Sequence, residues 1–191
     1  IYDDSMWLID LVENLLSVTR IEEGRMQIRQ SAELVDEVIR EALKHTGQSR
    51  TGRTIKVEEE DELILAKMDA RLIVQVLINL IGNAVKYTPQ GTDITVRVRK
   101  EKAENGENSQ VIISVCDLGD GIPDDRKERV FDMFYTGGDQ VADSRRSLGL
   151  GLGLCRSIIN AHGGKIWISD NIPHGAVVTF TLPAEEVALN E

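Results

Sequence analysis

The apolar positions between residues 69 and 89 predict one long helix that is buried on nearly every side. At roughly 100° per residue, its aliphatic side chains fill most of the helix circumference. Asp69 is a favourable N-cap, and the helix is expected to end before Pro89, because the residue preceding a proline avoids the α region. The polar positions form a single stripe, which consists of Gln75, Asn79, Asn83 and Lys86, with Tyr87 at its edge. This stripe predicts either amides that satisfy backbone groups in the core or the wall of a polar ligand pocket.

Two amphipathic helices are predicted before this one. Residues 1–21 carry apolar side chains at i, i+3, i+4 and i+7 spacing, which indicates a helix whose apolar stripe needs a partner helix. Ser31 is expected to cap the second helix. The residues expected to face inward from it are Leu34, Val35, Val38, Ile39, Ala42 and Leu43. Between the two helices, residues 25–29 are expected to form a short strand.

The remaining segments alternate apolar and polar residues and predict strands. These are residues 54–58, 63–67, 93–99, 111–115, 165–169 and 175–182. An acidic turn joins the first two, and an Asn-Gly turn, which is typical of hairpins, joins the third and fourth. Helices mixed with hairpins predict a two-layer α/β sandwich of about five strands under about three helices, with a helical appendage at the N-terminus.

Length and composition indicate either one ample domain or a domain with an appendage, and they limit its partners. The 191 residues are 41% hydrophobic, which is enough for a core, while a net charge of -10 argues against nucleic acid as a partner. Cys116 and Cys155 lack CxxC spacing and sit in apolar segments, so we expect reduced core thiols. No apolar run is long enough to span a bilayer, and no signal peptide precedes the chain. Because the chain starts abruptly in helix-like sequence, we expect a fragment of a longer protein.

Three glycines at alternate positions open the predicted helix that ends near His162. Gly149, Gly151 and Gly153 do not form a dinucleotide fingerprint, because Leu154 occupies the place of its last glycine, and no Gly-Lys-Ser/Thr follows for a Walker loop. A flexible glycine loop before a helix N-terminus favours phosphate, since exposed N–H groups and the helix dipole attract anions. A plain flexible hinge is the alternative.

A carboxylate with two nearby glycines follows the predicted strand 111–115. Asp117 can accept a hydrogen bond from an exocyclic amine, while Gly119 and Gly121 let a flat base approach the backbone. A simple Asx turn is the alternative. The spacing of oxygen ligands does not match an EF-hand calcium loop.

Together these elements resemble the catalytic and ATP-binding domain of bacterial sensor histidine kinases, within the superfamily that includes gyrase, Hsp90 and MutL. QVLINLIGNAVKYTP is similar to the family's N box, DLGDGIP to its first glycine box, ERVFDMF to its F box and GLGLGL to its second glycine box, all in family order. AHGGKIWIS and the closing GAVVTFTLP are most similar to KdpD-type kinases. The resemblance implies the Bergerat-type fold for residues 25–191. Residues 1–24 resemble the second helix of the dimerisation and phosphoacceptor hairpin.

The resemblance also implies roles for individual residues. Asn83 would supply its side-chain carbonyl to Mg²⁺, and Asn79 would act beside it in the same role or one shell further out. Lys86 would contact phosphate, Tyr87 would lie against the ribose or base, and Asp117 would accept from the adenine amine. The other residues implied in ATP binding are Gly119, Gly121, Ile122, Leu148, Gly149, Gly151, Gly153 and Leu154. Arg145 or Arg146, in a lid between the F box and the glycines, would stabilise the transferring γ-phosphoryl group.

The implied function is transfer of the γ-phosphoryl group of Mg-ATP to a histidine and then to the aspartate of a response regulator. The partners would be a receiver domain, the phosphoacceptor hairpin and a second copy of the full-length protein, with this part on the cytoplasmic side of a membrane sensor. The family's phosphorylated histidine would precede Ile1, and His45, His162 and His174 do not substitute for it. The alternative is an ATP-hydrolysing switch of the gyrase, Hsp90 or MutL type. The resemblance places a glutamate base in those proteins where this chain has Asn79, which favours phosphotransfer.

Overall fold

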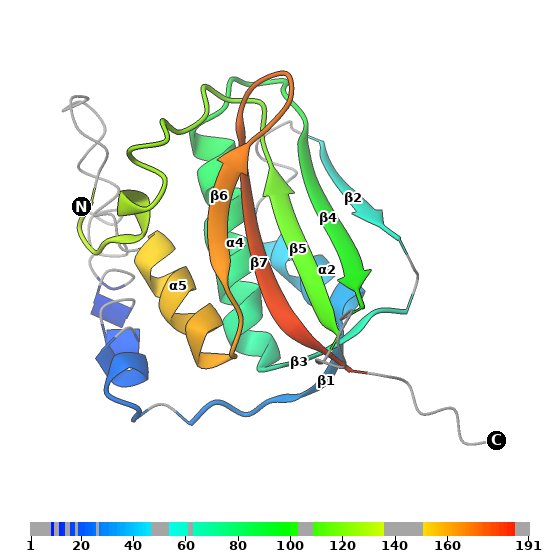
Figure 1. The fold of residues 1–191 in the computed structure, drawn as a ribbon, viewed down its shortest axis with the longest axis vertical. Coiled ribbons are helices and arrows are strands. Elements are labelled where there is room, and N and C mark those ends of the chain that lie inside the picture. The colour runs from blue at the N-terminus through cyan, green and yellow to red at the C-terminus, as the bar shows by residue number, and fades with distance from the viewer. Residues whose placement is uncertain are drawn as a thin grey trace.

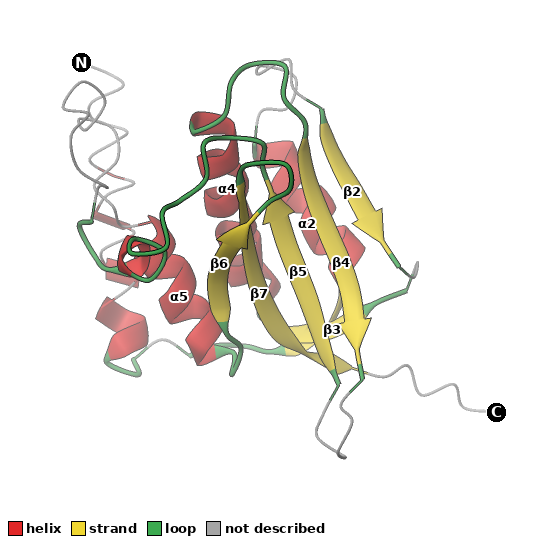
Figure 2. Cartoon of the chain, turned by 45° about the horizontal axis from the view of Figure 1, so that its top comes forward, coloured by secondary structure: helices red, strands yellow, loops and turns green. Residues whose placement is uncertain are grey.

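The computed structural model describes residues 9, 12–13, 16–17, 19–25, 27–46, 54–60, 63–102, 109–135 and 151–185. One sheet forms one layer, and α2 (Val35–His45), α4 (Ala70–Lys86) and α5 (Gly151–Ala161) cover one of its faces (Figures 1 and 2). A short 3-10 helix, η1 (Arg129–Phe131), precedes α5. The two-layer α/β sandwich predicted from the sequence is therefore confirmed.

Seven strands make up the sheet in the described part of the chain, against about five expected. They are β1 (Ser31–Leu34), β2 (Ile55–Glu59), β3 (Leu65–Met68), β4 (Ile94–Glu101), β5 (Gln110–Cys116), β6 (Ile166–Asp170) and β7 (Ala176–Glu185). Their order is β1-β3-β7-β5-β4-β2, and β6 also pairs with β7. All pairs are antiparallel except β2 with β4. β2 and β3, consecutive in the sequence, therefore lie toward opposite edges of the sheet.

The sheet is centred on β7. One edge of this strand pairs with β5 along residues 110–116. Its other edge pairs with β6 over residues 176–180 and with β3 at residues 184–185. Strands from three separate parts of the chain therefore meet on β7, and Figure 1 shows it running between β6 and β5.

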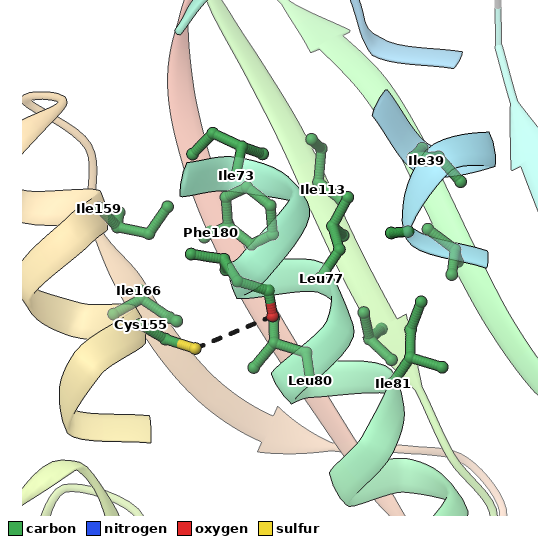
Figure 3. Close-up of a cluster of buried hydrophobic side chains, with 14 of the residues drawn as sticks. Ile39, Ile73, Leu77, Leu80, Ile81, Ile113, Cys155, Ile159, Ile166 and Phe180 are labelled. Atoms are coloured by element: carbon green, nitrogen blue, oxygen red, sulfur yellow. Dashed lines mark hydrogen bonds between the residues drawn. The ribbon is translucent and has the colours of Figure 1, made fainter. Parts of the chain in front are cut away.

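The hydrophobic core lies between the sheet and α4. Figure 3 shows Phe180 of β7 beneath Ile73 and Leu77 of α4, with Ile159 of α5 on the other side, and all four are fully buried. Burial of each such side chain contributes about 1.5–3 kcal/mol. The residues of α4 that are buried are Leu72, Ile73, Val76, Leu77, Leu80, Ile81 and Ala84. The helix is therefore apolar on nearly every side because most of its surface is buried in the core, as predicted.

The boundary before α2 differs from the prediction. Residues 31–34 form β1, which pairs antiparallel with β3, and α2 begins only at Val35. Ser31 is therefore not the cap: its hydroxyl donates to Glu33 Oε1 at 2.5 Å. The short strand expected at residues 25–29 is found at residues 31–34 instead. Pairing of these residues with β3 outweighs the local capping pattern.

Asp69 occupies the N-cap position of α4 as expected, but its carboxylate does not cap the helix. Asp69 Oδ2 accepts instead from the Arg29 backbone N–H and from Arg71 Nη2, both at 3.2 Å. The Asp69 N–H donates to Nε2 of buried His162 at 3.0 Å, and Nδ1 of that ring lies 2.7 Å from the Ile158 carbonyl. His162 thereby ties the end of α5 to the start of α4, a role that its sequence position did not indicate.

Both cysteines are free and buried, as predicted. Burial raises the pKa of the Cys155 thiol to about 12. Its Sγ donates weakly to the Val76 carbonyl at 3.8 Å (Figure 3). Burial also raises the pKa of Cys116, so neither thiol is an ionised nucleophile at neutral pH.

The described residues of the first segment, up to residue 22, are helical, as predicted. Ile9, Val12 and Leu16 lie on one stripe and are 51%, 50% and 47% exposed. The predicted antiparallel pairing of β4 with β5 is confirmed, while the Asn-Gly turn between them lies outside the described residues. Among the helices that the structure describes, none has the length and apolar character needed to cross a membrane.

Candidate functional site

Three elements meet along the polar stripe of α4. The loop that follows β5 passes the C-terminal end of α4, where the space beside Gly119 is bounded by the Tyr87 carbonyl. Further down the stripe, Asn79 faces Gly151, the first residue of α5. Figures 1 and 2 show the loop arching from the end of β5 toward α5. The structure therefore brings together the predicted N box, first glycine box and start of the second glycine-box helix.

Asp117 is the most tightly positioned polar side chain of the site. Its Oδ1 accepts from the Gly119 N–H at 2.9 Å and from the Ala176 N–H at 3.1 Å. Its own N–H donates to the Ala176 carbonyl at 2.9 Å. Within the described part of the chain, Oδ2 accepts no hydrogen bond. The Asx turn considered as the alternative is present, and it leaves one carboxylate oxygen for a donor from outside.

Gly119 and Gly121 are required by the protein's own packing. A Cβ on Gly119 would come 2.8 Å from the Tyr87 carbonyl oxygen and 3.2 Å from Asp117 Oδ1. Gly121 has φ +76° and would place a Cβ 3.1 Å from the Gly175 carbonyl. Any larger residue would therefore push the loop away from α4 or from β7. Ile122, next in the loop, is partly buried against the core.

Asn79 carries a polar atom that the fold satisfies only weakly. Its Nδ2 is buried without an oxygen or nitrogen partner among the described residues, and only the sulfur of buried Cys155, a weak acceptor, is close enough to interact with this amide. A Cβ on Gly151 would lie 3.8 Å from Asn79 Oδ1, so the amide faces the opening turn of α5. Leaving a buried amide donor entirely unpaired costs about 1–3 kcal/mol, and a weak sulfur acceptor offsets only part of that, so a stronger acceptor on a ligand or water would stabilise the site.

The rest of the stripe is open to solvent to increasing degrees. The Asn83 side chain is half-buried, and Lys86 and Tyr87 are exposed. Tyr87 is 62% exposed, and Lys86 Nζ lies 5.1 Å from the centre of its ring. The stripe thus supplies amide oxygens, one positive charge and one aromatic face along a single side of α4.

The first residues of α5 divide between the site and the core. Gly151 faces Asn79, whereas Gly153 is buried, and a Cβ on it would come 3.1 Å from the Phe131 carbonyl. Leu154 is fully buried in the hydrophobic core, so only its backbone is available to a ligand. Arg156 stacks over Phe131 at 4.1 Å and bonds to Glu128 at 2.8 Å, which joins the F-box segment to α5.

Four predicted site residues lie outside the described residues. They are Arg145, Arg146, Leu148 and Gly149, together with most of the predicted lid. Among the described residues, no group of three or more His, Cys, Asp or Glu side chains is arranged to hold a metal ion.

Three residues of the loop between β6 and β7 belong to the site and were missed in the sequence. Asn171 Nδ2 donates to the Asp117 carbonyl at 2.7 Å, and His174 Nδ1 lies 2.9 Å from the Gly119 carbonyl. Gly175 has φ +111° and would place a Cβ 2.1 Å from the Asp117 carbonyl oxygen. A turn composition of Asn, Pro and Gly just before an alternating strand was the only available signal.

Residues 68–186 match the family model described as histidine kinase-, DNA gyrase B-, and HSP90-like ATPase. The chain belongs to this family. The matched region runs from β3 to the end of β7 and so contains the whole site described above. The Bergerat-type fold expected from the sequence is confirmed.

Curated and solved relatives place the chain among the histidine kinases of that family. It is 42% identical over 185 residues to the sensor protein KdpD of Clostridium acetobutylicum, covering 97% of this chain and 20% of that protein. The chain thus spans about a fifth of the length of that relative. The catalytic domain of the histidine kinase ThkA is 32% identical with a TM-score of 0.67, over 81% of this chain and 95% of that domain.

A further solved structure that matches this chain is a complex of two proteins. The structure of ThkA in complex with the response regulator protein TrrA matches with a TM-score of 0.68 and 29% identity, over 93% of this chain and 49% of that one.

Proposed function

We propose that this chain is the ATP-binding catalytic part of a sensor histidine kinase and transfers the γ-phosphoryl group of Mg-ATP to a histidine outside it. The observation that carries the proposal is Asp117, whose carboxylate is fixed at Oδ1 and open at Oδ2, at one end of a stripe whose Asn79 amide faces the start of α5. Residues 25–191 would form this catalytic domain.

The base end of the site fits adenine. The adenine amine is a donor, and the Asp117 Oδ2 is an acceptor held in one orientation. Guanine presents a carbonyl oxygen at the equivalent position, which would face a carboxylate without a proton between them. A charged hydrogen bond of this kind contributes about 1.5–3 kcal/mol, enough for discrimination of roughly 10- to 100-fold.

The other end fits a polyphosphate. Asn79 Nδ2 is a buried donor whose one neighbouring acceptor among the described residues is the weak sulfur of Cys155, and Lys86 supplies an exposed positive charge on the same stripe. The N-terminus of α5, at Gly151, adds N–H groups and the positive end of the helix dipole. Gly149, Leu148 and the backbone of Gly153 and Leu154 would extend this contact.

Asn83 would hold Mg²⁺ through its side-chain oxygen, since a hard divalent cation prefers oxygen ligands. Bound there, the ion would neutralise charge on the phosphates. Arg145 or Arg146 would add positive charge at the γ-phosphoryl group.

Phosphotransfer is favoured over hydrolysis by the chemistry of Asn79. An amide cannot accept a proton from water, so this position offers no general base. An acceptor histidine outside this chain is supported by the histidines present, since His162 is buried with both ring nitrogens engaged, while one ring nitrogen of His45 meets Glu41 and one of His174 meets the Gly119 carbonyl. An ATP-hydrolysing conformational switch remains the alternative and would release phosphate without any acceptor helix.

The first segment and the relatives support the proposed partners. An exposed apolar stripe at Ile9, Val12 and Leu16 suits the second helix of a dimerisation hairpin, here residues 1–24, that packs on a partner helix and a second copy. The complex of ThkA with TrrA supports a receiver domain as the next phosphoryl acceptor. A cytoplasmic position within a membrane sensor goes with this role.

Calorimetry tests the binding half of the proposal. The chain should bind ATP with Mg²⁺ more tightly than GTP. Asp117→Asn should weaken ATP binding by about 10- to 100-fold, because an amide loses the charge and half of the acceptor capacity. Asp120→Asn, an exposed neighbour in the same loop, is the matched control and should bind ATP as the parent does. Equal ATP affinity of the Asp117 variant and the parent would refute the base assignment.

Phosphotransfer is tested with radiolabelled ATP and an added phosphoacceptor hairpin. Acid-labile, base-stable label should appear on the hairpin only when this chain is present. Label on His45, His162 or His174 of the chain alone would contradict the proposal, and steady phosphate release without a hairpin would favour the ATPase alternative.

A further inference from the structure

We propose that Asn171 and His174, in the loop between β6 and β7, are positioning residues that set the preference of Asp117 for adenine. This inference rests on the proposed function. Asn171 and His174 donate to backbone carbonyls of the loop that carries Asp117, not to its carboxylate, so both would act through the backbone of that loop. They would therefore determine specificity indirectly, by holding the loop that positions Asp117.

The two side chains hold the peptide groups on either side of the one whose N–H, that of Gly119, orients Asp117. Asn171 bonds to the carbonyl of Asp117, which belongs to the peptide between residues 117 and 118. His174 bonds to the carbonyl of Gly119, which belongs to the peptide between residues 119 and 120. The N–H that orients Asp117 Oδ1 belongs to the peptide between these two, at Gly119. With both flanking peptides held, this N–H has one direction.

The loop itself has little other resistance to rotation. Gly119 and Gly121 have no side chains to limit their dihedral angles, and Gly121 already has a positive φ. A peptide carbonyl next to glycine can rotate at small cost once its partner is removed. Once either flanking peptide is free, the peptide between residues 118 and 119 can also turn, which would withdraw the Gly119 N–H from Asp117 Oδ1 and let the carboxylate turn more freely about its χ2 bond.

The chemistry of both donors is unambiguous. A carbonyl oxygen can only accept, so His174 Nδ1 carries the proton, whatever the state of Nε2. The Asn171 oxygen accepts from the Ile172 N–H at 2.9 Å, which fixes its NH₂ group toward the Asp117 carbonyl. The Asn171 N–H donates to the Gly175 carbonyl at 3.0 Å, so the loop is closed on itself before it holds the other loop.

The test measures the dissociation constants of ATP and GTP, with Mg²⁺, for the parent and four variants. His174→Leu and Asn171→Ala remove the donors and should weaken ATP binding by about 5- to 10-fold, as expected for one lost hydrogen bond, while GTP binding stays the same. His174→Asn places an amide N–H near the position of Nδ1 and should restore ATP binding to within about 3-fold of the parent. Ile172→Ala, whose side chain is 90% exposed in the same loop, is the control and should change neither constant.

Coupling to Asp117 separates positioning from simple stabilisation. In an Asp117→Ala background, His174→Leu should leave the ratio of the ATP and GTP constants unchanged, because its effect passes through the missing carboxylate. An equal loss of ATP and GTP affinity in the single variants, or the same loss of ATP affinity in the Asp117→Ala background, would overturn the inference. Urea unfolding of each variant identifies any that lose nucleotide binding by unfolding.

Failure of this inference is distinct from failure of the proposed function. A parent chain that binds ATP and prefers it to GTP, with loop variants that keep the full preference, contradicts only the positioning role. A parent chain that shows no preference for ATP contradicts the assignment of Asp117 and the inference together.

Discussion

The two ends of the candidate site are built in opposite ways. At the base end, Asp117 and its loop are held by hydrogen bonds from Asn171, His174 and Ala176, all within 3.1 Å. At the phosphate end, the buried Asn79 Nδ2 has only the weak sulfur acceptor of Cys155 among the described residues, and the Asn83 side chain is half-buried beside exposed Lys86. One end is complete before a ligand arrives, and the other is completed by it.

This difference divides the work of binding. A fixed carboxylate loses little conformational entropy on meeting the base, so the base end supplies selectivity at low cost. The weakly satisfied donor at the other end makes the empty fold less stable than an apolar substitute would, and part of that free energy returns when a stronger, anionic acceptor arrives. Four substitutions test this division, in order of decreasing effect.

Gly175→Ala should disrupt the base end most severely. Its Cβ would lie 2.1 Å from the Asp117 carbonyl oxygen, and its φ of +111° is strained for alanine. We expect a loss of about 2–5 kcal/mol in the free energy of unfolding, from backbone strain and overpacking, together with loss of ATP binding. Urea denaturation and calorimetry measure the two effects.

Gly163→Ala is the matched control for this substitution. Gly163 also has a positive φ, +75°, but a Cβ there would have no neighbour within 4 Å. It should lower stability by only about 1–2 kcal/mol and leave ATP affinity unchanged. Similar stability losses in the two variants would show that the contact with Asp117 is not decisive.

His162→Gln should show that α5 is anchored at the end away from the phosphates. Loss of the buried ring removes its contacts to Asp69 and Ile158 and should lower stability at pH 7.5 by about 1–3 kcal/mol. Burial lowers the pKa of His162 in the folded chain, so below about pH 6.5 the unfolded chain binds a proton that the folded chain does not. Stability of the parent should therefore fall as pH decreases from 7.5 to 5.5.

The control for the pH effect is the variant itself. His162→Gln has no group that titrates there, so its unfolding free energy should decrease less than that of the parent over the same pH range. Parallel pH dependences, measured by urea denaturation in matched buffers, would contradict the assignment of a neutral buried imidazole.

Asn79→Leu should stabilise the fold while damaging the phosphate end. Replacing an amide whose Nδ2 meets only the weak sulfur acceptor of Cys155 by an apolar side chain of similar size should raise the free energy of unfolding by about 0.5–1 kcal/mol. ATP affinity should fall by about 10-fold or more, since one donor to the phosphates is lost. A destabilised variant would mean that the amide is satisfied in solution.

Arg156→Lys should have the smallest effect. Lysine keeps the charge opposite Glu128 but loses the planar stacking over Phe131, which is worth about 0.5–1 kcal/mol. ATP affinity should not change, because neither group belongs to the stripe. A large loss of affinity, measured by calorimetry, would show that the F-box segment is coupled to the phosphate end through this contact.

Sequence periodicity predicted the elements that depend on local pattern. α4 and its polar stripe follow from a long run in which almost every non-polar position must be buried, so the placement of Asn79, Asn83 and Lys86 on one side needed no tertiary information. The predicted start of α2 was wrong because residues 31–34 pair with β3, about 34 positions further along the chain. A capping pattern reads only neighbouring residues and cannot reveal such a partner.

The contacts that complete the base end could not be read from the sequence. Asn171 and His174 bond to backbone carbonyls 54 and 55 residues earlier in the chain. A hydrogen bond from a side chain to a backbone carbonyl requires a particular residue type only for the donor. Every residue has a backbone carbonyl, so the sequence does not mark the acceptor. Both residues therefore look like ordinary turn residues until the β6–β7 loop is placed beside Asp117.

The position of β7 in the chain has a consequence for biosynthesis. Asp117 receives its bond from Ala176 only after a further 59 residues have been added to the nascent chain. Until then β5, β6 and β3 lack the strand with which all three pair, and their N–H and C=O groups are open to other chains. Pairing between such distant parts of the chain is slow. A chain whose synthesis stops before β7 would therefore be prone to aggregate.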